Sequence, residues 1–309
     1  CALQISDIWL REDGTDARLT SEGVSAMRRG RGDTHWLSWG PDGDRIAFLD
    51  ATGTLSTVDA DTGEVEALTH HDGPDIGLAW GEQGIATVTN AVSRAALVLV
   101  DPETGSQQVL ADGDHPYNDP RWGEDGLYAV RAPHRSLFDF ESELVRFPIE
   151  ESGIAAEPEV VFAADAVRVQ TPRPRPDGDG VAFVHDASGF DEIHYADGEA
   201  VAAAAGSDGE SAETTTVHAV DETEVGAPEW HPDGDRIAFT ATHEGRANVG
   251  VTGIDGDADL LSEGDVFHTG PCWLDGDVLT VRGAPTTPPQ VWNASEDEPA
   301  IETGSVGFE

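Results

Sequence analysis

The chain has 309 residues and a formal net charge of −43, from 60 Asp and Glu against 17 basic residues, which are all arginine. So large a negative charge excludes nucleic acids and anionic membrane surfaces as partners, because both are polyanions. The two cysteines have no paired spacing, which argues against a disulfide framework or a zinc site, and no apolar run approaches the length of a membrane span.

The acidic residues are spread over regularly patterned segments instead of forming one acidic tail. A compact state with this charge repels itself in dilute buffer. At about 1 M salt the Debye length falls to about 3 Å, which screens most of that repulsion. The composition therefore predicts a protein adapted to the cytoplasm of a halophilic organism.

The chain opens with a predicted hairpin over residues 5–20, in which Ile8-Trp9-Leu10 and Ala17-Arg18-Leu19 are strand-like and a Glu-Asp-Gly-Thr turn separates them. The same pattern returns at 55–69 and at 97–110. The opening segment is therefore interpreted as the second half of a repeat whose first half is absent, and the chain as a fragment of a longer one.

A distinctive string at 39–48, Trp-Gly-Pro-Asp-Gly-Asp-Arg-Ile-Ala-Phe, returns at 230–239 with a single substitution, His for Gly. Proline presets φ, aspartate bonds its own backbone and glycine accepts a positive φ, so the string predicts a tight turn between two strands. Weaker copies follow the same pattern at 80–84, 122–126, 174–178 and 273–276.

The tryptophans of these strings recur every 41 to 43 residues where the repeats are regular. Four strands in 40 to 45 residues is the period of a β-propeller blade, and one blade cannot bury both faces alone. We therefore expect an all-β, seven-bladed propeller as a single domain over 1–309, with six full four-stranded repeats after an incomplete first blade. The expected blades span 1–25 (half), 33–70, 75–111, 117–163, 168–220, 226–263 and 267–304.

Two repeats are longer than the others. The first contains residues 131–140, which predict a loop between the second and third strands. The second contains residues 202–216, which are rich in Ser, Glu, Ala and Thr and predict a mobile surface segment.

Most of the eight tryptophans are predicted to serve packing. Trp9 and Trp292 match third-strand positions and are expected in the core, whereas Trp36 has no equivalent and is a weak indication of a ligand surface. The five that share the position before the turn are expected to pack between blades: Trp39, Trp80, Trp122, Trp230 and Trp273.

Several motifs that mark catalysis or cofactor binding are absent from the sequence. No serine has glycine at both −2 and +2, and neither a His-Glu-x-x-His metal motif nor a phosphate-binding or dinucleotide-binding glycine pattern occurs. The spacing of Asp255, Asp257 and Asp259 suits a calcium loop, but Leu260 and Val266 occupy the positions that require Gly and Glu. We therefore expect no catalytic residue, cofactor or metal ion.

One basic cluster, formed by Arg28, Arg29 and Arg31 in a glycine-containing loop, is unusual in so acidic a chain. The planar guanidinium forks suit an anion or carboxylate clamp that contacts a substrate or partner. The favoured alternative is a loop that neutralises neighbouring carboxylates.

The string at 39–48 and 230–239, with the hairpin ends at 18–20 and 67–69, resembles the propeller repeat of TolB-like proteins and of the prolyl oligopeptidase family. The number of repeats, the long middle repeats and the closing segment 284–292 are more similar to the N-terminal propeller of an acylaminoacyl-peptidase-like serine peptidase. This resemblance implies a non-catalytic propeller that restricts access of short peptide substrates to an α/β-hydrolase domain. The sequence ends at Glu309 before any such domain, so no catalytic residue can be assigned from the family.

Two alternatives remain open. One is a free-standing TolB-like propeller that recruits a protein partner, and the other is a propeller enzyme with its site in the central channel. Hydrolysis of an aminoacyl or acylpeptide substrate by this chain alone would favour the last.

The charge leads to a prediction about salt. The melting temperature should be higher in 3 M KCl than in 0.1 M KCl, because screening at molar salt removes the self-repulsion of the carboxylates. Thermal denaturation followed by circular dichroism measures this difference. A melting temperature that is equal or lower in 3 M KCl would contradict adaptation to high salt.

Overall fold

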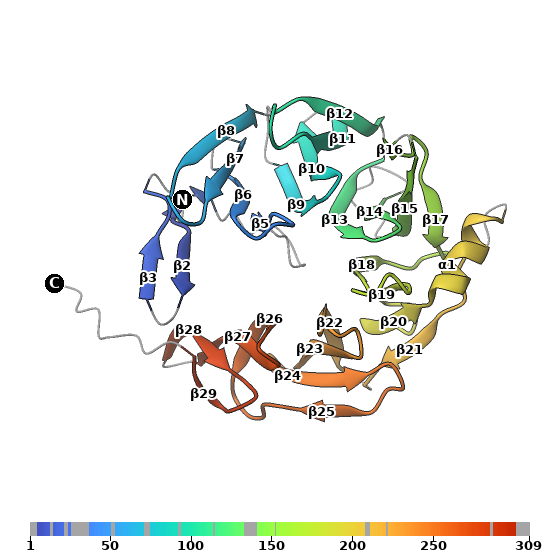
Figure 1. Cartoon of the computed structure of the whole chain (residues 1–309). Coiled ribbons are helices and arrows are strands. Elements are labelled where there is room, and N and C mark those ends of the chain that lie inside the picture. The colour runs from blue at the N-terminus through green and yellow to red at the C-terminus, as the bar shows by residue number, and fades with distance from the viewer. Residues whose placement is uncertain are drawn as a thin grey trace. The chain divides into compact units, whose positions relative to one another are not determined.

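The computed structural model describes residues 5–12, 15–21, 24–25, 37–50, 53–70, 75–91, 94–113, 115–132, 141–151, 153–207, 211–220, 222–284 and 287–300. These residues form antiparallel β-sheets and one short helix (Figure 1). The chain divides into two compact units, unit 1 (Cys1–Phe162) and unit 2 (Ala163–Glu309).

Unit 1 contains three sheets of four or five strands, β5–β8, β9–β12 and β13–β17, and two short strand pairs, β1–β4 and β2–β3. Its strands are β1 (Ile5–Ser6), β2 (Trp9–Glu12), β3 (Thr15–Arg18), β4 (Val24–Ser25), β5 (Leu37–Trp39), β6 (Arg45–Leu49), β7 (Thr54–Asp59), β8 (Val65–His70), β9 (Asp75–Gly81), β10 (Gly84–Ala91), β11 (Arg94–Val100), β12 (Gln107–Gly113), β13 (Tyr117–Gly123), β14 (Gly126–Arg131), β15 (Glu143–Glu150), β16 (Gly153–Ile154) and β17 (Glu159–Phe162).

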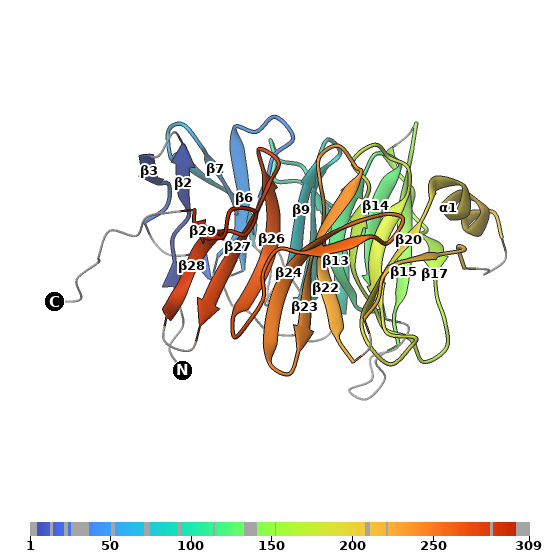
Figure 2. The same ribbon diagram turned by 90° about the horizontal axis from the view of Figure 1, so that it is seen from below.

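Unit 2 contains the sheet β18–β21 and two further groups of four strands, β22–β25 and β26–β29, which one parallel bridge between Ala247 and Phe267 joins. Figure 2 shows β22, β23 and β24 beside β26, β27 and β28. The elements of unit 2 are β18 (Val169–Pro174), β19 (Val181–His185), β20 (Glu192–Ala196), α1 (Gly198–Ala205), β21 (Thr215–His218), β22 (Glu224–Trp230), β23 (Arg236–His243), β24 (Arg246–Gly253), β25 (Ala258–Leu260), β26 (Phe267–Leu274), β27 (Asp277–Ala284), β28 (Thr287–Asn293) and β29 (Glu298–Pro299).

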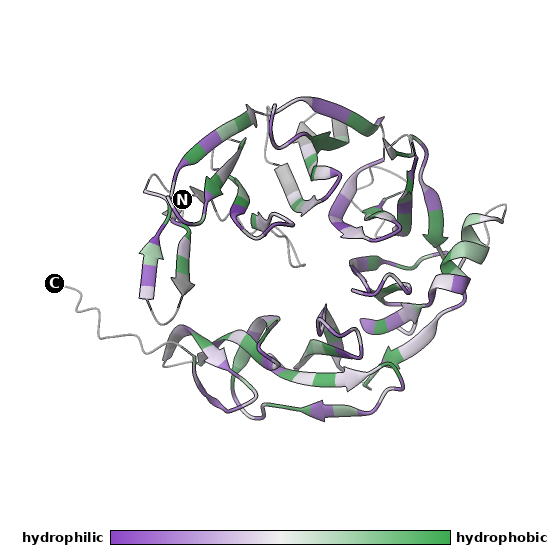
Figure 3. Ribbon diagram, in the orientation of Figure 1, coloured by the Kyte–Doolittle hydropathy of each residue, from purple (hydrophilic) through white to green (hydrophobic). Residues whose placement is uncertain are grey.

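The expected four-stranded repeat is confirmed: among the described residues, six groups of strands each begin with a strand before the turn string, followed by a strand after it and then a hairpin. The third sheet carries one strand more than expected, β16, which pairs with the end of β15. Figure 3 shows hydrophobic residues along the strands, and inner strands such as β14 and β19 are buried along almost their whole length, as sheets covered on both faces require.

The third and fourth strands of the first two sheets are joined by the same side-chain-capped turn. Asp59 Oδ1 accepts hydrogen bonds from the backbone N–H and the hydroxyl of Thr62, both at 2.7 Å. Asp101 accepts the same pair from Thr104 at 2.8 and 2.9 Å. These bonds lower the pKa of both aspartates, since the charged form is the better acceptor.

In both units, the tryptophan before one turn packs on the turn of the preceding sheet. A Cβ on Gly81 would lie 2.5 Å from Cγ of Trp122, so the ring occupies the space that glycine leaves. Arg45 lies 5.2 Å from the ring centroid of Trp80, a cation–π distance. Neighbouring sheets within each unit are therefore held together by aromatic side chains placed once per repeat.

The indole N–H groups make a second contact that also repeats. Each donates a hydrogen bond to a backbone carbonyl of the preceding sheet, that of the residue just before that sheet's own tryptophan position. Trp122 donates to the carbonyl of Ala79 at 3.2 Å. Trp230 donates to that of Arg173 at 2.8 Å, and Trp273 to that of Glu229 at 2.9 Å. The predicted packing between repeats is thus confirmed for Trp80, Trp122, Trp230 and Trp273.

Two tryptophans differ from the prediction. The expectation that Trp39 packs between blades is wrong, since it is 43% exposed and no described turn lies beneath it. The expectation that Trp9 lies in the core is also wrong, since it is 60% exposed on a hairpin that, among the described strands, pairs only within itself. Trp292 is half-buried beneath Arg282, 4.1 Å from its ring centroid. Trp36 lies outside the described residues.

The predicted mobile segment 202–216 is also corrected. Its first residues belong to α1, whose N-cap Asp197 accepts a hydrogen bond from Ala200 N at 2.8 Å. Val201 and Ala204 are buried at 1% and 5% exposure, and residues 215–216 belong to β21. The composition of this segment hides the helix, because alanine contributes little hydrophobic area although it has the highest helix propensity. The predicted loop at 131–140 lies largely outside the described residues.

Unit 2 buries titratable side chains between its strands. His268 is 1% exposed, and its Nδ1 lies 3.0 Å from Thr280 Oγ1. Burial lowers the pKa of His268 to about 4, and the charge of Arg282 adds to this. The folded state therefore holds His268 neutral.

No helix among the described residues is both long enough and apolar enough to cross a bilayer.

Removing a packed tryptophan should cost far more stability than removing an exposed one at the same repeat position. Trp230→Ala should lower the free energy of unfolding by about 3–5 kcal/mol, because the ring is 6% exposed and its N–H is bonded. Trp39→Ala is the matched control and should cost less than about 1 kcal/mol. Urea denaturation at fixed molar KCl measures both, and equal losses would refute the packing role.

Stability should also depend on pH through His268. Its pKa lies below that of an unfolded histidine, so the stabilisation is complete above pH 6.5 and is lost as pH falls towards 4. The loss amounts to about 3 kcal/mol for one such group. His268→Gln should unfold with a smaller dependence on pH between 7 and 4.5, since the carboxylates are common to both proteins. Identical pH profiles in urea denaturation would exclude a neutral buried His268.

Candidate functional site

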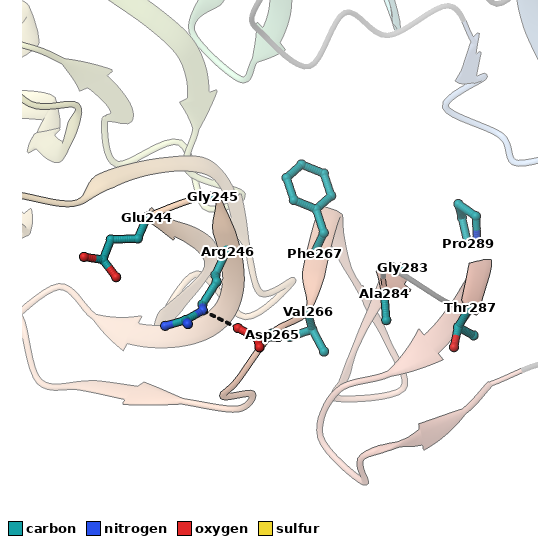
Figure 4. A pocket seen from close by; sticks show the side chains of 10 residues that line it. All are labelled: Glu244, Gly245, Arg246, Asp265, Val266, Phe267, Gly283, Ala284, Thr287 and Pro289. Atoms are coloured by element: carbon teal, nitrogen blue, oxygen red, sulfur yellow. Dashed lines mark hydrogen bonds and ion pairs between the residues drawn. The ribbon is translucent and has the colours of Figure 1, made fainter.

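A pocket of about 440 Å³ opens in unit 2 between segments that are separated in sequence (Figure 4). The turn between β23 and β24, the loop that enters β26, the end of β27 and the start of β28 supply its walls. The lining residues are Glu244, Gly245, Arg246, Asp265, Val266, Phe267, Gly283, Ala284, Thr287 and Pro289. Its size lies within the range of small-ligand pockets.

The β23–β24 turn fixes the charged side of the pocket. Glu244 and Gly245 both have positive φ, +49° and +80°, as a two-residue hairpin turn that matches the strand twist requires. Arg246 follows directly, and its Nε donates to Asp265 Oδ1 at 2.5 Å. The charged side chains are well exposed, so this ion pair forms a rim and contributes little to stability.

Phe267 forms the apolar centre of the pocket. Its backbone pairs with Ala247 of β24, which fixes the strand, while its ring is 50% exposed. In Figure 4 the ring stands between the Arg246–Asp265 pair and the side that carries Ala284, Thr287 and Pro289. Gly283 lies opposite Phe267 in the ladder, and a Cβ there would make an ordinary contact with Pro289 at 3.8 Å.

The lining combines an apolar centre with a charged rim. Its ten residues include one hydroxyl, that of Thr287, two carboxylates, those of Glu244 and Asp265, and one guanidinium, that of Arg246. An exposed phenyl ring beside proline and alanine binds an apolar or aromatic group. The carboxylates and guanidinium at the rim are hydrogen-bonding groups.

A second feature that places side chains is a bulge in the first strand of each of five sheets. The residue three positions before the tryptophan position has a positive φ in every case: Gly77 (92°), Asp119 (49°), Thr171 (48°), Ala227 (50°) and Gly270 (58°). The pairing register shifts across the same points. Such a backbone costs about 1–3 kcal/mol at a non-glycine residue, and bulges re-aim the side chains that follow.

Two of the re-aimed side chains are arginines that are already paired. Arg173, with its side chain 7% exposed, donates from Nε to Glu229 Oε2 at 3.0 Å and from a terminal nitrogen to the Pro172 carbonyl at 3.0 Å. Arg121 pairs with Asp119 at 2.6 Å in unit 1. Both guanidinium groups are neutralised by carboxylates, so they hold first strands in place and are not free anion-binding groups.

The predicted basic cluster is not tested, because Arg28, Arg29 and Arg31 lie outside the described residues. Within the part of the chain that is described, no three His, Cys, Asp or Glu side chains gather as a metal site. The pocket is not predictable from a motif, since Phe267 and Pro289 belong to none. The bulges are not among the predicted features either, although the spacing Pro-x-Trp at 120–122, 228–230 and 271–273 marks three of them.

Comparison with known proteins gives no match by sequence: no family model and no curated protein matches the chain. Solved structures do match by fold. A puromycin-hydrolyzing peptidase from Mycobacterium tuberculosis is 17% identical with a TM-score of 0.71, over 94% of this chain and 47% of the peptidase. The acylaminoacyl peptidase of Pyrococcus horikoshii is 15% identical with a TM-score of 0.61, over 91% of this chain and 45% of that one.

TolB from Acinetobacter baumannii is 16% identical with a TM-score of 0.53, over 83% of this chain and 62% of TolB. The chain spans about half the length of the two peptidases that it matches. These likenesses, together with the repeated antiparallel sheets, show that the chain has the all-β propeller fold. The number of blades stays a prediction.

Proposed function

We propose that this chain is the non-catalytic propeller of a serine peptidase of the prolyl oligopeptidase family. In this proposal it restricts access to, and orients short peptides for, an α/β-hydrolase domain. The observation that carries the proposal is a similarity of fold. It extends over 94% of this chain and over 47% of a puromycin-hydrolyzing peptidase. The charge adds a high-salt cytoplasm as the proposed setting.

The pocket around Phe267 supports a role in peptide contact. Its apolar centre suits one apolar side chain of a peptide, and Arg246, Asp265 and Glu244 place hydrogen-bonding groups on one side of that centre. A contact of this kind positions a substrate without performing chemistry on it.

A second candidate function is a free-standing TolB-like module that binds a protein partner. The likeness to TolB, over 83% of this chain and 62% of TolB, favours it. The two candidates differ in what polypeptide accompanies the propeller in the cell.

The peptidase proposal is tested by enzymatic activity with and without the encoded continuation. The 309-residue chain alone should not hydrolyse aminoacyl or acylpeptide substrates, because no serine of the chain lies in a Gly-x-Ser-x-Gly motif. The coding sequence beyond Glu309 should encode that motif. The longer polypeptide should cleave short peptides and spare an unfolded protein, and deletion of residues 1–309 should weaken this size limit.

Controls separate the candidates. Phe267→Ala in the longer polypeptide should raise KM for substrates with an apolar side chain, whereas Phe190→Ala, which removes another exposed phenyl ring (38% exposed), should not. A stop codon directly after Glu309 would contradict the peptidase proposal and favour the TolB-like module. Hydrolysis by the 309-residue chain itself would contradict both.

A further inference from the structure

The charges at the rim of the Phe267 pocket do not balance. Two carboxylates, those of Glu244 and Asp265, stand against the one guanidinium of Arg246. Asp265 accepts a hydrogen bond from Arg246 Nε at 2.5 Å, which neutralises the guanidinium and leaves the charge of Glu244 uncompensated by it. The Glu244 side chain is 71% exposed, so its carboxylate is accessible to a ligand.

His243, the residue before Glu244, does not satisfy this carboxylate. Its Nε2 lies 4.0 Å from Glu244 Oε1, which is beyond hydrogen-bonding distance. Its Nδ1 lies 2.8 Å from the carbonyl oxygen of Glu222, and because a carbonyl only accepts, the proton of the neutral ring is on Nδ1. Nε2 of that ring therefore has no proton to donate to Glu244.

The arginines of the neighbouring strands are engaged elsewhere. Arg236 stands at the start of β23, whereas Glu244 follows its end, and the guanidinium lies 5.2 Å from the ring centroid of Trp273. Arg282 lies 4.1 Å from the ring centroid of Trp292. Neither guanidinium is paired with Glu244, so the described part of the rim presents a net negative charge to a ligand.

The apolar group and the uncompensated carboxylate are separated. In Figure 4 the Glu244 carboxylate lies on the far side of Arg246 from the Phe267 ring. A ligand that touches both must be extended, as a peptide in β conformation is. Side chains two residues apart in such a peptide point the same way and are about 6.5–7 Å apart. With an apolar side chain on Phe267, a long lysine or arginine side chain two residues away is directed along the pocket towards Glu244.

We propose that the Phe267 pocket selects peptides in which an apolar or aromatic side chain has lysine or arginine two residues away, and that Glu244 selects the charge. This names the class of peptide for the contact in the proposed function, and it rests on that function. The Phe267 ring takes the apolar side chain, and the Glu244 carboxylate accepts hydrogen bonds from the ammonium or guanidinium group. A glutamate at that place in the peptide meets a like charge instead.

The test separates this local contact from the general attraction of cations by a chain of net charge −43. At about 1 M KCl the Debye length is about 3 Å, so distant carboxylates are screened while groups in hydrogen-bond contact still interact. The 309-residue chain is titrated in 1 M KCl at pH 8 with two capped peptides. One is acetyl-Gly-Lys-Gly-Phe-Gly-Lys-Gly-amide, and the other has glutamate in place of both lysines. Fluorine NMR of 4-fluorophenylalanine in each peptide measures Kd, and the charges on both sides make the result independent of peptide direction.

The lysine peptide should bind about fivefold more tightly than the glutamate peptide. Glu244→Gln should reduce this ratio to about twofold or less. Glu82→Gln is the matched control, since it removes one exposed carboxylate from the turn between β9 and β10 in unit 1, and it should leave the ratio unchanged. Phe267→Ala should weaken binding of both peptides by about tenfold.

Equal Kd values for the two peptides, with binding weakened by Phe267→Ala, would overturn the charge selection and leave the peptide contact standing. A preference for lysine that Glu244→Gln reduces no more than Glu82→Gln would also overturn it, because general attraction would then be its source. Binding of neither peptide would overturn the peptide contact together with the selection. The peptidase proposal is decided separately, by the coding sequence beyond Glu309.

Discussion

The packing of a tryptophan on the turn of the preceding sheet is the interaction on which the rest of the structure depends. A single four-stranded sheet has two faces, and each must be covered by a neighbour. In Trp122, Trp230 and Trp273 the ring supplies the covering area, and the indole N–H satisfies a carbonyl of the preceding first strand. The turn string thus connects two strands and also contacts the tryptophan of the next repeat. Gly81 leaves space for the ring of Trp122, and His231 meets the ring of Trp273 edge-on.

The sequence predicted the sheets well because the repeat period and the turn chemistry are local. It placed the hairpins ending near Thr69 and Leu110 within a few residues. It assigned all five repeat tryptophans to packing between sheets, and the structure confirms four of these assignments. The prediction is wrong for Trp9 and Trp39, which are exposed. A local sequence pattern identifies the position of a residue within a repeat, but it does not show whether a neighbouring strand buries that residue. It also missed α1, whose alanines bury little area yet form a helix capped by Asp197.

The candidate site was less predictable for a physical reason. The pocket is formed by residues from three segments that are separated in sequence, and its centre, Phe267, is an ordinary strand residue whose exposure depends on its neighbours. The strained residues Asp119, Thr171 and Ala227 could have been suspected only from the proline that follows each of them. Composition, in contrast, predicts salt dependence without any knowledge of the fold.

The central claim is that the repeat tryptophans form the contacts between sheets, and hydrogen exchange at the indole N–H groups tests it directly. Exchange can be followed residue by residue with NMR on tryptophan-labelled protein. The account predicts slow exchange for Trp122, Trp230 and Trp273, whose N–H groups are bonded to backbone carbonyls, and fast exchange for the exposed Trp9 and Trp39. Equally fast exchange at all five indoles would contradict it.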